Sequence, residues 1–237
     1  MNFELTEEQQ LVKENLATVA NNILKPKAAY YDKTHEFPTD HIETLKELGM
    51  MGIVYPEKYN GSEMDYVSYA IAIEELARGC ASTSVIISAH NSLCLSPIFY
   101  FGTEKQKDIY MPKLCSGEWL GCFAITEPEA GSDAAGTKTT AKLDGDTYIL
   151  NGTKNFITNG GEADVAIVMA STDKEKGHHG LSCFIVERKF PGYSVGKAEE
   201  KLGIHASSTT ELVFDNCKVP KENLLGNSGD GFRIAMH

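Results

Sequence analysis

The sequence predicts an α+β protein of separate domains, in which an all-helical N-terminal domain precedes an antiparallel β-barrel domain. Up to about residue 118, apolar residues recur at helical spacing, and after Trp119 short β-branched runs alternate with turn dipeptides. No helical patterns separate these runs, which argues against a parallel α/β sheet. The predicted domains are residues 1–118 and 119–228, and residues 229–237 begin a further helical segment.

The helical half begins with a capping box, in which Thr6 is followed three residues later by Gln9. The apolar positions of one helical face come next, namely Val12, Leu16, Val19 and Ile23. Pro26 is expected to end or kink this helix, because proline lacks the N–H that an interior helical turn needs. A second helix is predicted over residues 39–48, with Gly49 as its stop.

Three more helices complete this half. Asp65 is placed to cap the first of them, and Thr103 with Gln106 forms a second capping box before the last. Between these two helices, Ser82–Tyr100 is almost wholly apolar. This composition predicts a buried helix with a break at Pro97.

The second half contains six runs rich in β-branched or apolar residues, which predict strands over Leu120–Thr126, Thr137–Leu143, Thr147–Leu150, Val165–Ser171, Leu181–Val186 and Thr210–Phe214. The dipeptides Asp144-Gly145 and Asn151-Gly152 predict hairpin turns. Helical spacing returns after Gly231.

The composition argues against several function classes. Lys+Arg total 22 against 33 Asp+Glu, and the net charge of −11 disfavours nonspecific binding to nucleic acid. Apolar runs such as Val165–Ala170 are much shorter than the ~20 residues of a membrane helix. The acidic start of the chain does not resemble a signal peptide, and six scattered cysteines predict buried, reduced thiols. We therefore expect a cytoplasmic protein without a membrane partner.

Three groups of residues invite a chemical interpretation. Glu127, Glu129 and Asp133 form a cluster of carboxylates, which can do acid/base work but is more often a set of solvated loop charges. The glycine-rich segment 226–231 lacks the spacing of a phosphate-binding loop, so it predicts a flexible start to a helix. The pair His178-His179 predicts a solvated loop and not a metal site.

Two further segments share an arrangement of hydroxyls and glycines. Residues 123–133 leave a strand and enter a loop of Pro, Gly and Ser, which can present backbone N–H groups and hydroxyls to a cofactor with a pyrophosphate. Residues 155–161 repeat the arrangement as an aromatic residue, a hydroxyl and a glycine turn. The residues alone leave two interpretations open, which are ordinary hairpin chemistry and a site for a polar cofactor.

Four segments in the same order resemble the acyl-CoA dehydrogenase family: 126–133 (TEPEAGSD), 151–160 (NGTKNFITNG), 201–210 (KLGIHASSTT) and 214–226 (FDNCKVPKENLLG). The resemblance extends along the chain, and it looks strongest to the short-chain, butyryl-CoA-type enzymes. It implies FAD as cofactor and the first two domains of the family as the fold.

By position, the resemblance implies that one segment lies along the flavin ring, namely Phe123, Ala124, Ile125 and Thr126. Thr126 would hydrogen-bond the polar edge of the ring. Gly131 and Ser132 would meet the pyrophosphate, with Ser132 also near the CoA part of the substrate. A second segment would lie on the other side of the ring, formed by Phe156, Ile157 and Thr158, with the Thr158 hydroxyl near flavin N5.

The implied activity is the FAD-dependent α,β-dehydrogenation of a short-chain acyl-CoA, with electrons passing to an electron-transferring flavoprotein. The resemblance places the catalytic base in a third, helical domain beyond His237, so no catalytic residue is assigned here. The chain alone is therefore expected to be inactive, and the family implies a homo-oligomer. One departure is His205, which stands where the family usually carries Arg.

Two alternatives remain open. The chain is a non-catalytic assembly subunit that pairs with a complementary chain, or it belongs to an acyl-CoA oxidase or to a dehydrogenase for branched or dicarboxylic acyl groups. These relatives share the same loops, so the loops do not distinguish among them.

Overall fold

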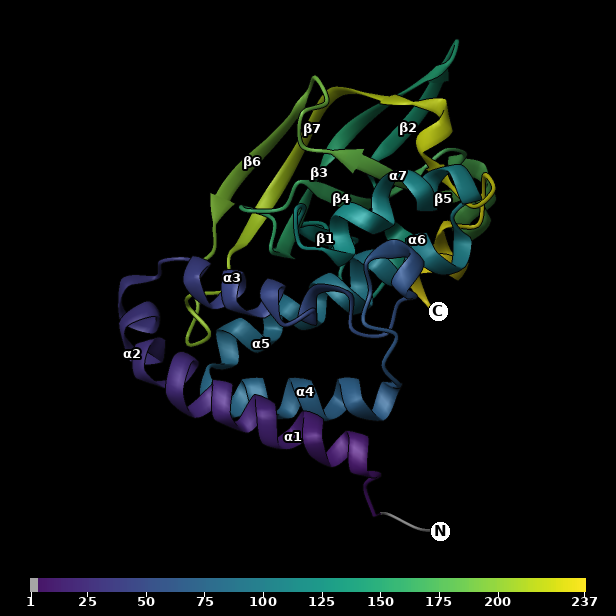
Figure 1. Ribbon diagram of the computed structural model, residues 1–237. Coiled ribbons are helices and arrows are strands. Elements are labelled where there is room, and N and C mark those ends of the chain that lie inside the picture. Colours follow the sequence, from purple (N-terminus) through teal and green to yellow (C-terminus); the bar gives the residue numbers. More distant parts are fainter. Residues whose placement is uncertain (1–3) are drawn as a thin grey trace.

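The computed structural model describes residues 4–237, which form a helical layer and a β-sheet (Figure 1). The helices are α1 (Glu7–Val19), α2 (Lys25–Thr34), α3 (Thr39–Glu47), α4 (Tyr66–Gly79), α5 (Ala81–Ser88), α6 (Ser96–Phe101), α7 (Glu104–Cys115) and α8 (Gly231–Ala235). The strands are β1 (Gly121–Ala124), β2 (Thr140–Asp144), β3 (Thr147–Thr158), β4 (Val165–Ser171), β5 (Leu181–Glu187), β6 (Tyr193–Ala198), β7 (Thr209–Pro220) and β8 (Leu224–Leu225). The predicted order, helices before strands, is confirmed.

The helix starts follow the predicted caps. Both capping boxes form, at Thr6 before α1 and at Thr103 before α7. The Asp65 side chain accepts a hydrogen bond from the backbone N–H of Ser68 and so caps α4. Gly49 follows α3 with a φ of 71°, a left-handed conformation that glycine adopts without a steric penalty.

Neither proline breaks its helix. A π-helical segment, Ala20–Leu24, joins α1 to α2 just before Pro26, and a second one, Ala89–Leu95, joins α5 to α6 just before Pro97. The wider π turn accommodates a proline, whose ring otherwise clashes with the carbonyl group four residues earlier. The break predicted at Pro97 is therefore a change of helical pitch within a continuous helix.

The continuous helix Ala81–Phe101 has 21 residues and is, by length and composition alone, apolar enough to cross a membrane. No apolar run of this length was expected from the sequence. This helix was not recognised, because serine, asparagine and histidine interrupt the apolar residues. Of its most apolar window, 56% is buried inside the protein, and it packs Cys94, Leu95 and Ile98 against the sheet. A helix that is mostly buried in a protein core can be as long and as apolar as one that crosses a membrane, so length and composition do not distinguish the two.

The sheet is mixed rather than wholly antiparallel, which refines the predicted barrel. Its strand order is β6-β7-β3-β2-β4-β5-β8, and β1 pairs with β4 outside this path. The β1–β4 pairing is parallel, and β2 also meets β4 in parallel at one residue pair. The remaining pairings are antiparallel. Residues 125–164 supply the long connection that a parallel pair needs.

One predicted hairpin turn forms and the other does not. Gly145 lies in the turn between β2 and β3, and Asp144 is the last residue of β2, so the turn lies one residue later than predicted. Asn151-Gly152 instead continues β3, where the register against β7 shifts and the Asn151 side chain accepts a hydrogen bond from the backbone N–H of Asn216. The sequence also gave no sign of β6, which is a mostly exposed strand at the edge of the sheet.

Strand β4 places the core on both sides of the sheet. Val165, Ile167 and Met169 pack with the helical layer, whereas Ala166 and Val168 face the interior of the β domain. A third cluster fills the helical layer around α1, α3 and α4. All six cysteines are buried and free, as predicted.

Candidate cofactor site

The two segments implicated by the sequence lie side by side at the ends of β1 and β3. The backbone N–H of Asn155 donates to the carbonyl oxygen of Thr126 at 2.8 Å. This bond joins the segment that ends at Thr126 to the segment that begins at Phe156. β1 and β3 are not neighbours in the sheet. A pattern of strands in the sequence therefore did not indicate that the ends of these two strands lie close together.

Phe156 is presented outward by a β-bulge. Between Lys154 and Ile157, β3 has one residue more than the facing stretch of β7, so the side chains of both Lys154 and Ile157 face inward although they are three positions apart. Phe156 lies within this bulge with a φ of 58°, and 59% of it is exposed. A left-handed aromatic residue is strained, and such strain persists only where the surrounding structure enforces it.

The hydroxyl groups of this region are free to bind a ligand. Within residues 4–237, the side chains of Thr126, Ser132 and Thr158 make no hydrogen bond to another protein group. Gly131 and Ser132 are exposed on the loop after β1, and a Cβ built at Gly131 would meet nothing within 4 Å. The loop therefore leaves open space beside its backbone.

The remaining predicted contacts fall into two groups. Phe123 and Ile125 are partly buried, and Phe123 lines a small cavity of about 90 Å³ together with Leu93 and Phe101. Ala124 and Ile157 are core residues, with 0% and 2% exposure. These last two can offer a ligand only their backbone groups.

Glu127 is not a solvated loop charge, so that interpretation of the sequence was wrong for this residue. Its Oε1 atom accepts from Lys154 Nζ at 2.7 Å and from the backbone N–H of Thr139 at 3.0 Å, and its Oε2 atom accepts from the backbone N–H of Lys138 at 2.6 Å. Burial raises the pKa of Glu127, but the ammonium group of Lys154 and these hydrogen bonds outweigh it and hold the pKa below its usual value.

Lys154 is a buried charged residue beside the candidate site, and the sequence reasoning did not single it out. Its side chain is 0% exposed, and besides Glu127 it donates to the carbonyl oxygen of Ile125 at 3.0 Å. A signal was present in the sequence, because Lys154 shares the alternation of the inward residues Tyr148 and Leu150. A lysine at an inward strand position predicts a buried acidic partner.

His205, which stands in place of the expected arginine, joins its loop to helix α2. Its Nδ1 atom lies 3.0 Å from Asp32 Oδ1, and its Nε2 atom lies 2.7 Å from the carbonyl oxygen of Lys201. A carboxylate and a carbonyl group only accept hydrogen bonds, so the ring of His205 lies between two acceptors, one on α2 and one in its own loop. The backbone N–H of His205 also bonds Asp32, and this bond is the main reason why the pKa of Asp32 is lowered.

We expect His205→Gln to loosen the loop of residues 199–208, because the single amide group of glutamine cannot occupy the positions of both ring nitrogens, beside Asp32 and beside the carbonyl oxygen of Lys201. Leu202 is fully exposed, so trypsin should cleave after Lys201 faster in this variant than in the wild type. His205→Arg supplies several donors and should remain as resistant as the wild type. Equal cleavage rates in all three proteins would show that His205 does not hold this loop.

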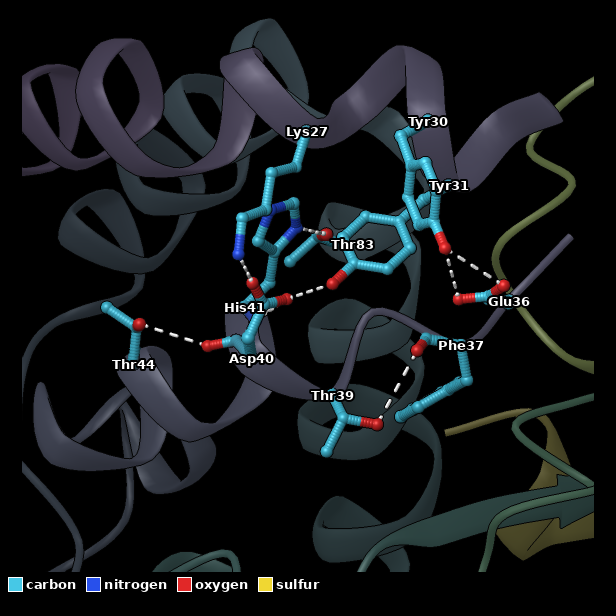
Figure 2. A network of polar contacts seen from close by, with 10 residues as sticks. All are labelled: Lys27, Tyr30, Tyr31, Glu36, Phe37, Thr39, Asp40, His41, Thr44 and Thr83. Atoms are coloured by element: carbon cyan, nitrogen blue, oxygen red, sulfur yellow. Dashed lines mark hydrogen bonds and ion pairs between the residues drawn. The ribbon is translucent and has the colours of Figure 1, made fainter. Parts of the chain in front are cut away.

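A second polar network lies in the helical layer, next to the part of α2 that His205 contacts (Figure 2). Asp40 accepts hydrogen bonds from Lys27 and Tyr31, which outweigh the effect of burial and lower its pKa to about 2. The neighbouring His41 is 0% exposed and its Nδ1 atom lies 2.9 Å from the Thr83 hydroxyl. This network ties α2 to α3 and α5.

Across residues 4–237, no group of His, Cys, Asp and Glu is arranged to hold a metal ion.

Comparison with known proteins gives matches along the whole chain. Residues 6–118 match the family model described as acyl-CoA dehydrogenase, N-terminal domain, and residues 122–217 match the acyl-CoA dehydrogenase middle domain. The short-chain-specific acyl-CoA dehydrogenase of Clostridium acetobutylicum is 50% identical over 236 residues. That match covers 100% of this chain and 62% of the relative, so the chain spans less than two thirds of the relative's length.

Solved structures give the same result. Butyryl-CoA dehydrogenase from Megasphaera elsdenii has a TM-score of 0.96 at 47% identity, covering 100% of this chain and 63% of that one. The Bacillus anthracis acyl-CoA dehydrogenase complexed with FAD has a TM-score of 0.92 at 40% identity, covering 98% of this chain and 40% of that one. A chain in the electron-transferring flavoprotein structure from Acidaminococcus fermentans has a TM-score of 0.97 at 49% identity, covering 100% and 62%.

Proposed function

The chain belongs to the acyl-CoA dehydrogenase family, a family of oxidoreductases that act on CH–CH groups, and we propose that it forms the helical and flavin-facing parts of a short-chain acyl-CoA dehydrogenase of the butyryl-CoA type. The relative from Clostridium acetobutylicum, which is specific for short chains, supports this substrate class. The proposed division of the chain is 1–118 and 119–228, with 229–237 beginning a third part; α7 ends and β1 begins on either side of the first boundary.

The proposed cofactor is FAD, which when bound supplies the ring that accepts the hydride from the β-carbon. The observation that carries this assignment is the exposed, strained Phe156, which lies on a bulge whose Asn155 is hydrogen-bonded to Thr126. An aromatic face and free hydroxyl groups suit a flat, polar ring. The FAD bound by the Bacillus anthracis relative supports the same assignment.

The residues of this chain would bind and orient that ring. We propose that Phe123, Ile125 and Phe156 contact it and that the hydroxyls of Thr126 and Thr158 donate to its polar atoms, including N5. Fixed donors stabilise the negative charge that gathers on a reduced flavin, without reorganising during the reaction. Ser132 and Gly131 would meet the pyrophosphate, and Ser132 would also contact the CoA part of the substrate.

The base that removes the α-proton is not assigned within this chain. Glu127 is the acid next to the proposed contacts, but its side chain is only 3% exposed and its oxygens accept from three donors. A carboxylate held in this way does not reach a substrate proton. We therefore propose that Glu127 is structural and that the chain alone does not turn over butyryl-CoA.

The proposed partners follow from the same family. Electrons would pass to an electron-transferring flavoprotein, and the neighbour from Acidaminococcus fermentans supports this partner. Self-association is supported by Leu93 and Tyr100 on the apolar helix, which are 44% and 46% exposed. We propose a cytoplasmic location for this chain, whose relative from Clostridium acetobutylicum is a bacterial acyl-CoA dehydrogenase.

The proposal is tested by titrating the purified chain with FAD and following flavin fluorescence. We expect Phe156→Ala to weaken FAD binding by about tenfold, because an aromatic contact contributes on the order of 1 kcal/mol beyond its buried area. Tyr66→Ala is the matched control, since Tyr66 is also 59% exposed but lies on α4. Unchanged affinity in Phe156→Ala, or equal losses in both variants, would contradict the assignment.

A further inference from the structure

The buried pair Lys154–Glu127 joins the two proposed cofactor-contacting segments, 123–126 and 156–158, where each segment adjoins the sheet. Lys154 is the last residue of β3 to pair with β7 before the bulge that holds Phe156. Glu127 directly follows Thr126 in the chain. The ion pair and the Asn155–Thr126 backbone bond therefore form two adjacent ties across the same gap, at 2.7 and 2.8 Å.

The pair also fixes the backbone on either side of that gap. Lys154 Nζ donates to the carbonyl oxygen of Ile125, and the Glu127 carboxylate accepts from the backbone N–H groups of Lys138 and Thr139. The end of β1, the start of β2 and the bulge of β3 are thus held by one lysine and one glutamate. Each charged group has directional partners, so the pair defines spacing as well as proximity.

Stability alone does not account for such a pair. Removing two charges from water is costly, and well-packed apolar residues in the same place are often as stable or more so. The side chains are 0% and 3% exposed, so neither offers a ligand an appreciable contact surface. What the pair provides, and apolar residues would not, is a fixed distance between Thr126 and the bulge.

We propose that Lys154 and Glu127 are positioning residues, which set the geometry of Thr126 relative to the Phe156 bulge and thereby the affinity and absorption spectrum of bound FAD. This inference rests on the proposed function for the identity of the ligand. The tie itself is a property of the protein without cofactor, so it is tested separately.

The test uses the double variant Lys154→Met with Glu127→Gln, which leaves no unpaired buried charge and keeps an acceptor for a backbone N–H. Without cofactor, amide hydrogen exchange should be faster at Asn155 than in the wild type, while amides in β4 and β5 keep their protection. With FAD, the dissociation constant should rise about tenfold, as expected when contact groups are misplaced, and the visible spectrum of the bound flavin should change.

Arg78→Met is the matched control, because it removes the ion pair with Glu75 on α4, remote from the loops, and should change neither readout. Unchanged exchange at Asn155 in the double variant would overturn the inference, whatever FAD does. Faster exchange with unchanged FAD affinity and spectrum would overturn it too. If the wild-type chain binds no FAD while the exchange result is as expected, the proposed function fails and the pair is only a structural tie.

Discussion

Lys154→Met is expected to lower the free energy of unfolding by about 3–5 kcal/mol, the usual effect of removing one partner from a buried ion pair. The variant leaves the Glu127 carboxylate 3% exposed with only the backbone N–H groups of Lys138 and Thr139 as partners. Two backbone hydrogen bonds do not offset the cost of burying a carboxylate charge that has lost its cationic partner. Equilibrium urea unfolding, followed by circular dichroism, measures the loss.

Two further variants separate the charge from the volume of the side chain. Adding Glu127→Gln to Lys154→Met removes the unpaired charge, so the double variant should recover most of the lost stability. Lys107→Met breaks a pair whose acidic partner, Glu104, is 73% exposed, and should change stability by less than about 1 kcal/mol. A double variant as unstable as Lys154→Met alone would show that packing, and not charge, determines the effect.

The helical half was predictable because its signals are local. A cap such as Thr6 with Gln9, or Asp65 before α4, involves residues three apart, and the structure forms each of them. The π segments before Pro26 and Pro97 were not predictable, because a proline in a helical pattern indicates a disturbance without specifying its form.

The sheet shows where local signals stop. The dipeptide Asn151-Gly152 is as good a turn signal as Asp144-Gly145, yet the first continues a strand because twelve-residue β3 pairs with β7 on both sides of it. The parallel pairing of β1 with β4 joins residues more than forty positions apart, for example Gly121 with Val165. Such pairings are decided by tertiary packing and not by propensity.

The candidate site was predictable only in part. The residues alone favoured an ordinary hairpin over a cofactor loop, and only the family resemblance selected Phe123–Thr126 and Phe156–Thr158. The Lys154–Glu127 pair was missed because a glutamate in a Pro/Gly loop is normally solvated. Only the fold shows that the loop at Glu127 turns inward against β3. The site therefore depends on a contact between residues 27 positions apart.

His90 is expected to make the protein less stable as the pH falls from about 6.5 to 4. Its Nδ1 atom accepts from the backbone N–H of Gly121 at 2.9 Å, so its Nε2 atom carries the proton and donates to the carbonyl oxygen of Leu114 at 3.0 Å. The ring is 0% exposed, and this burial lowers the pKa of His90 from 6.5 to about 4. A proton on Nδ1 would face the Gly121 N–H, so protonation requires the clamp between α7, the π segment and β1 to open.

The sign follows from the two pKa values. In the unfolded chain His90 binds a proton below pH 6.5, whereas in the folded chain it binds one only near pH 4. The stability that neutral, buried His90 contributes is therefore complete above pH 6.5 and is lost as the pH falls from 6.5 to about 4. The shift corresponds to about 3 kcal/mol. Burial also lowers the pKa of His41, which contributes in the same direction, so the pH dependence of wild-type stability is not due to His90 alone.

Urea unfolding at several pH values between 7.5 and 4 should therefore show a shallower pH dependence of stability for His90→Gln than for the wild type. Parallel curves for the two proteins would mean that His90 is protonated without opening the clamp.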